Sequence, residues 1–277
     1  MFAVLQTEKR AADFISRISE RFTKSEPELI QVRIPGGAPF LTVRVKETKR
    51  GIPWDEVKQC AGRCSERMLL PLDTKLPENC GIGAFEPCSL PLKLCFNTAV
   101  RLISQSAINS SGLSVGIIDE TAVLSDELEK IVMLASNTYV ATQKMYNYER
   151  TAERFMRIYG APLNLVNDAD SLMNCDILIA PKLGLAEKSG ARLVFCPKSQ
   201  NENSEHVFCL IEGYGANAPE SIMRLCPDNI DEYLFCCAVF ELCSVRSIDT
   251  GIFKDIYFNS NPVSEYSASE KIRELFK

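Results

Sequence analysis

The sequence predicts an α/β protein whose mostly parallel sheet follows a smaller N-terminal α/β domain. After residue 112, apolar strands alternate with amphipathic helices, and the first three strands begin 25 residues apart, at Leu113, Thr138 and Leu163. Strands at this spacing are joined by right-handed crossovers in parallel sheets. The 277 residues are enough for one large domain or two modest ones. We expect residues 1–110 to form the N-terminal mixed α/β domain and residues 111–277 the larger one.

The first hundred residues carry the signals of a mixed α/β unit. The stretch "KRAADFISRISERF" has apolar residues at helical spacing, and "ELIQVRI" and "FLTVRV" flank the turn-forming "PGGAP". A helix is expected in "IPWDEVKQCAGRCSE", a short strand in "RMLLP" and a longer helix in "LPLKLCFNTAVRLISQSA". The polar "NSSG" at 109–112 is the best candidate for a linker.

The second part alternates regularly. Strands are expected in "LSVGIID", "TYVATQ", "PLNLVND", "CDILIAPK", "ARLVFCPK" and "HVFCLIEG". Helices are expected in "SDELEKIVMLAS", in "ADSLMN" and in "YERTAERFMRIYG", where Ala152, Phe155, Met156 and Tyr159 share one face. The apolar stretch 233–245 is shorter than the roughly 20 residues of a membrane-spanning helix. We expect a buried helix there that packs back, with the tail to Lys277, across one of the domains.

Composition narrows the partners. The net charge of -5 provides no general attraction to nucleic acid or to an anionic membrane, so neither is expected as a partner. A small-molecule ligand is the candidate partner. The N-terminus shows no export signal, so the cytoplasm is the expected compartment. In that compartment the twelve cysteines are expected to be free thiols. The oligomeric state stays open.

The order of elements from 113 to 182 resembles the Rossmann-like domains of NAD(P)-dependent dehydrogenases, particularly two-domain enzymes whose nucleotide half follows a smaller α/β half. The resemblance rests on topology and spacing. It implies a dinucleotide whose pyrophosphate lies on a glycine-rich first β–α turn, G-x-G-x-x-G/A. The matching turn here, "DETAVLSDE", contains no glycine and begins with Asp119 and Glu120. Ser125 is expected to cap the following helix, with Asp126 and Glu127 in its first turn.

A comparison of two electrostatic energies disfavours NAD(P) at this turn. A helix N-terminus favours an anion by roughly 0.3–1 kcal/mol, and by about 2 kcal/mol in the best cases. One carboxylate about 5 Å from a phosphate costs on the order of 3 kcal/mol at an effective dielectric constant of about 20. Even one such carboxylate therefore outweighs the helix dipole.

Two other stretches suggest a nucleotide. Thr142 and Lys144 follow the second strand, where a ribose 2′-phosphate is read in the resembled fold, although a polar strand end explains them as well. The stretch "GYGANA" matches G-x-G-x-x-A with Gly213, Gly215 and Ala218. Pro219 and Pro227 leave room for only a short helix after it, and the alternative is that this stretch is a loop without a ligand.

Acidic residues suggest a metal. Asp119, Glu120 and Asp168 follow the first and third strands, and oxygen ligands at one sheet edge suit Mg²⁺. The arrangement resembles the acidic pocket of receiver domains, with Lys182 or Lys198 as the completing lysine. The alternative is that these acids are solvated loop residues.

Cysteines and the single histidine offer further alternatives. Cys60 and Cys64 lie one helical turn apart and could ligate zinc or an iron–sulfur cluster, but the sequence holds no C-x-x-C pair. Buried structural thiols are favoured. His206 could act as a general base or lie on the surface.

The sequence predicts a protein with a degenerate Rossmann-like domain that binds a small ligand in a cleft between domains or serves as a scaffold. One alternative is an NAD(P)-linked oxidoreductase with an atypical phosphate loop. Another is a cysteine-ligated metal protein. Whether the protein is an enzyme stays open.

Overall fold

The structure is a computed structural model that describes residues 1–8, 26–48, 51–172, 174–187, 189–198, 208–245, 247–248 and 250–277. It divides into two compact units, each assembled from segments distant in sequence. Unit 1 comprises Met1–Pro87 and Ala218–Ser244, and unit 2 comprises Cys88–Asn217 and Val245–Lys277.

These units differ from the continuous segments 1–110 and 111–277 expected from the sequence. Helix α3 (Ser89–Ser106) belongs to unit 2, where it packs on two strands of the large sheet. Helix α7 (Glu232–Leu242) belongs to unit 1, where Phe235 meets the rings of Phe2 and Phe40 at centroid distances of 6.4 and 5.5 Å. Both helices are apolar enough to need a sheet to cover them, and the sequence alone does not say which sheet.

Unit 1 is built on a mixed sheet of order β2-β3-β1-β4. Strand β1 (Ala3–Glu8) pairs in parallel with β3 (Pro39–Lys46) and with β4 (Met68–Leu69). The expected hairpin is confirmed, because β2 (Glu28–Arg33) pairs antiparallel with β3. The expected helix in "KRAADFISRISERF" lies outside the described residues.

Helix α2 (Trp54–Ala61) covers one face of this sheet and continues into the 3-10 helix η1 (Gly62–Glu66). Val57 and Ala61 of α2 are buried in one core cluster with Ala3, Leu5, Val43 and Val45. The short helix α6 (Glu220–Met223) precedes α7 in the same unit.

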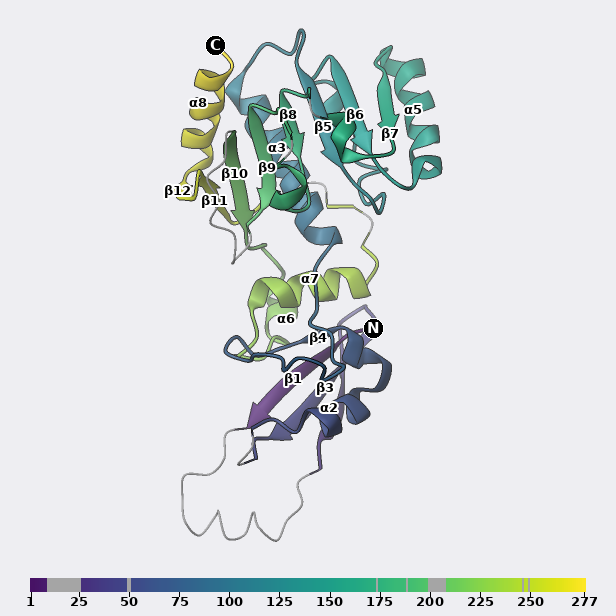
Figure 1. Cartoon of the computed structure of the whole chain (residues 1–277), viewed down its shortest axis with the longest axis vertical. Coiled ribbons are helices and arrows are strands. Elements are labelled where there is room, and N and C mark those ends of the chain that lie inside the picture. Colours follow the sequence, from purple (N-terminus) through teal and green to yellow (C-terminus); the bar gives the residue numbers. More distant parts are fainter. Residues whose placement is uncertain are drawn as a thin grey trace. The chain divides into compact units, whose positions relative to one another are not determined.

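Unit 2 holds, among the described residues, an eight-stranded sheet of order β12-β11-β10-β9-β8-β5-β6-β7 (Figure 1). Its parallel strands are β5 (Ser114–Ile118), β6 (Asn137–Ala141), β7 (Leu163–Val166), β8 (Ile177–Ile179), β9 (Leu193–Pro197) and β10 (Cys209–Tyr214). Numbered along the chain, these strands lie in the order 3-2-1-4-5-6, the order of the Rossmann fold. The predicted α/β class with a Rossmann-like, mostly parallel sheet is confirmed.

The C-terminal tail extends this sheet in a way that the sequence analysis missed. Strands β11 (Asp255–Phe258) and β12 (Asn261–Val263) add an antiparallel hairpin next to β10. Helix α8 (Glu265–Leu275) then packs against α3 (Figure 1).

The connections between the parallel strands are short. Helix α4 (Glu129–Val132) joins β5 to β6, and α5 (Met145–Tyr159) joins β6 to β7. The later crossovers use the 3-10 helices η2 (Ala169–Leu172) and η3 (Leu183–Leu185). Within the described part of the chain, none of the helices combines the length and the apolar character needed to cross a bilayer.

The buried face of α5 includes Phe155, as predicted, but differs from the predicted face at Met156 and Tyr159. Tyr148 and Phe155 are fully buried, whereas Met156 is 55% exposed. The inward face therefore runs through the tyrosine one turn into the helix, and that tyrosine contributes to the site described next.

Candidate functional site: the first crossover of unit 2

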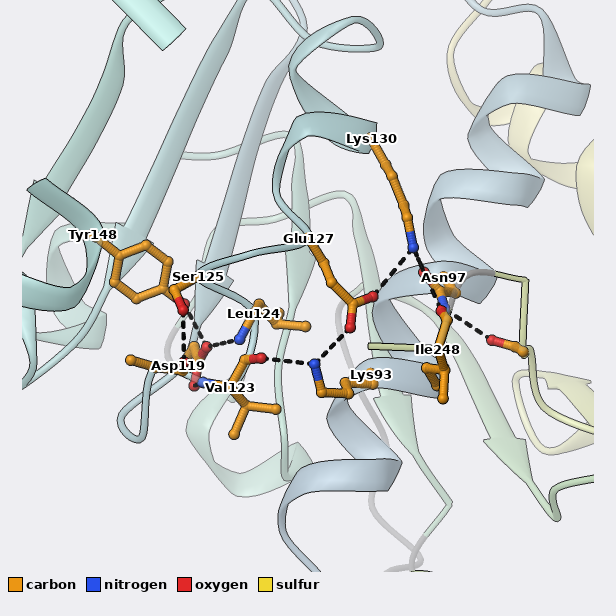
Figure 2. A network of polar contacts seen from close by, with 12 residues as sticks. Lys93, Asn97, Asp119, Val123, Leu124, Ser125, Glu127, Lys130, Tyr148 and Ile248 are labelled. Carbon is orange, nitrogen blue, oxygen red and sulfur yellow. Dashed lines mark hydrogen bonds and ion pairs between the residues drawn. The ribbon is translucent and has the colours of Figure 1, made fainter. Parts of the chain in front are cut away.

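The first crossover, residues 119–128, occupies the place of a phosphate-binding loop. Asp119 follows β5 directly and its side chain is completely buried. Its carboxylate accepts hydrogen bonds from the backbone N–H of Val123 at 3.1 Å and of Leu124 at 2.7 Å, and from the hydroxyl of Tyr148 on α5 (Figure 2). Three donors from two elements thus converge on one carboxylate.

The tyrosine is held in its donating form. Burial first, and then the charge of Asp119 beside it, raise the pKa of the Tyr148 hydroxyl. The hydroxyl therefore stays protonated over the physiological range and keeps donating to the carboxylate.

The helix expected from Ser125 onward is wrong in its first turn. Residues 123–128 form successive turns, and α4 begins only at Glu129. The Ser125 hydroxyl donates to the carbonyl of Ala122 at 3.2 Å and caps no helix. Ala122 itself adopts a left-handed backbone with φ +59°. Because Asp119 binds the N–H groups of residues 123 and 124, it closes a turn where propensity favoured a helix.

A buried ion pair fixes the other end of the crossover. Lys93 of α3 donates to the Glu127 carboxylate at 2.5 Å and to the carbonyl of Val123 at 2.8 Å. The side chains of Lys93 and Glu127 are 3% and 2% exposed, so both charges depend on each other. Lys130 adds a second contact to Glu127 at 3.2 Å.

The same network reaches the segment after residue 245. Asn97, one turn after Lys93, accepts from Lys130 at 3.0 Å. Its amide donates to the carbonyls of Ile248 at 2.8 Å and Gly251 at 3.0 Å. Figure 2 shows these side chains running from Asp119 to Ile248. The crossover is therefore held from α3, α5 and the C-terminal segment.

This arrangement decides what the crossover can do chemically. In the Rossmann fold, N–H groups of this turn bind a pyrophosphate. Here the N–H groups of Val123 and Leu124 already donate to an internal anion, Asp119. A pyrophosphate would have to displace that carboxylate and would meet its negative charge at short range.

The other predicted residues of this sheet edge are engaged locally. Glu120 is exposed in the turn. Thr142 is buried, and its hydroxyl accepts the N–H of Lys144 at 3.0 Å, while the Lys144 residue is exposed. Asp168 accepts the hydroxyl and the N–H of Ser171 at 2.8 and 2.9 Å. These bonds, the hydroxyl first, lower the pKa of the Asp168 carboxyl below its ordinary value.

The glycines of "GYGANA" are explained by packing. Gly213 lies in β10, and a Cβ there would stand 1.8 Å from the Phe253 ring. Gly215 has φ +78°, and its carbonyl accepts the N–H of Lys254 at 3.2 Å. Ala218, the last residue of the motif, belongs to unit 1. Both glycines therefore serve the close approach of the 253–254 segment.

The described residues do not form the metal sites considered from the sequence. Cys60 donates to the carbonyl of Pro27 at 3.8 Å, and Cys64 is buried in the unit 1 core. All twelve cysteines are free thiols. Among the described residues, no three histidine, cysteine or acidic side chains gather as a metal site. Lys198 lies over the Tyr257 ring at 3.3 Å from its centroid, and His206 lies outside the described residues.

Sequence reasoning missed the residues that complete the network. Lys93 and Asn97 stand inside the apolar run "LPLKLCFNTAV". A lysine at such a position needs a buried partner, since an unpaired charge in a core is expensive. That signal was available, but the identity of the partner, Glu127, was not.

The chain shows only distant similarity to known proteins. No family model and no curated protein matches the chain. Among solved structures, it resembles Δ1-pyrroline-2-carboxylate reductase from Thermococcus litoralis in complex with NADH and L-proline, with 18% identity, 36% of this chain and 30% of that chain covered, and a TM-score of 0.25. It also resembles L-tryptophan dehydrogenase from Nostoc punctiforme (10% identity, 99% and 80% covered, TM-score 0.31). A third is a shikimate 5-dehydrogenase-like protein (9% identity, 99% and 97% covered, TM-score 0.24). The chain thus spans under a third of the reductase, and the fold stated above follows from its own strand order and register.

Proposed function

We propose that this protein uses its Rossmann-like unit as a scaffold or to bind a small ligand, and that the unit takes no dinucleotide pyrophosphate at its first crossover. One observation carries the proposal. The carboxylate of Asp119 accepts the N–H groups of Val123 and Leu124, the donors that a pyrophosphate would need. These N–H groups therefore have an acceptor without any ligand, and the anion that they bind is a side chain of the protein itself.

The network around Glu127 supports the same proposal. A phosphate loop must present free N–H groups to its ligand. This loop is anchored instead by Lys93, whose ammonium contacts both Val123 and Glu127. Opening it for a dinucleotide would separate a buried ion pair, which costs about 3–5 kcal/mol when one partner is lost.

Thermal melting of the full chain with NAD⁺ or NADP⁺ tests the proposal. A ligand present at about 100 times its Kd adds about 2.7 kcal/mol of stability, which a melting curve resolves. We expect no shift at millimolar concentrations of either nucleotide. A saturable rise in melting temperature would overturn the proposal.

The second candidate is an NAD(P)-linked oxidoreductase with an atypical phosphate loop. The strand order 3-2-1-4-5-6 of unit 2 favours it. It requires the nucleotide to bind without the first-crossover amides. A melting shift that survives in an Asp119→Asn variant would support this candidate.

A further inference from the structure

We draw no further inference here: the strongest candidate, the sulfur-bearing side chains of Met223, Cys226 and Cys236 along α6 and α7 of unit 1, carries nothing, because both thiols already donate within the chain, Cys236 to the Met223 sulfur and Cys226 to the carbonyls of Pro227 and Ile230, and nothing else among the described residues points to a metal there.

Discussion

Replacing Asp119 with alanine should destabilise unit 2 strongly. The substitution leaves three donors without an acceptor: the N–H of Val123, the N–H of Leu124 and the hydroxyl of Tyr148. A buried donor left unsatisfied costs about 1–3 kcal/mol. At the lower value, three such donors lower the free energy of unfolding by about 3 kcal/mol.

Urea denaturation followed by circular dichroism measures this loss, and a double-mutant cycle with Tyr148→Phe isolates its origin. In the Asp119→Ala background the tyrosine hydroxyl is already orphaned, so removing it should cost less than in the unmodified chain. Additive effects of the two substitutions would refute the hydrogen bond between them. An Asp119→Ala variant within about 0.5 kcal/mol of the unmodified chain would refute the role of the carboxylate in the turn.

Three further predictions follow from unit 2. Glu127→Ala should lower the free energy of unfolding by about 3–5 kcal/mol in urea, because it leaves the Lys93 charge buried, and a Lys93→Met/Glu127→Leu double variant should recover most of it. Gly213→Ala should cost about 1–3 kcal/mol, since its Cβ would overlap the Phe253 ring, and a melting temperature equal to that of the unmodified chain would contradict this packing. Burial raises the pKa of Cys175 from 9.0 to about 11, so the unfolded thiol ionises first and stability should fall as pH rises from about 9 to 11. In Cys175→Ala that fall should be shallower, and an identical pH profile of the urea midpoint would count against the assignment.

The strands of unit 2 could be predicted because buried parallel strands are continuous apolar runs. Ser114–Ile118 and Leu193–Pro197 stand out in the sequence for that reason, and their spacing indicates the crossovers. The hairpin of unit 1 could also be predicted, because the glycines of "PGGAP" stand between two strand-like stretches. In the structure Gly36 of this turn adopts the left-handed backbone that favours glycine.

The first crossover could not be predicted in the same way. Ser125 followed by acidic residues has the local pattern of a capped helix, and local propensity favours one. The turn exists because Asp119 reaches the amides of Val123 and Leu124 and because Lys93, far away in sequence, draws Glu127 inward. Such tertiary contacts override propensity, and no window of sequence contains them.

The candidate site residues could be placed on the sheet from the sequence, but their tertiary contacts could not be predicted. From the sequence, Asp119 was expected at this edge of the sheet, either as a magnesium ligand or as a solvated loop residue. Its burial and its three donors turn it into an internal ligand of the loop. The burial of Tyr148 was not predicted, because the expected inward face of α5 included Met156, which is exposed.

The most direct test follows the backbone amides of Val123 and Leu124 by ¹H–¹⁵N NMR while NADP⁺ is added to the full chain. If Asp119 holds both N–H groups, their resonances stay in place throughout the titration and remain slow to exchange with deuterium. A saturable movement of both resonances, in step with nucleotide concentration, would mean that a diphosphate reaches these amides and would contradict the account.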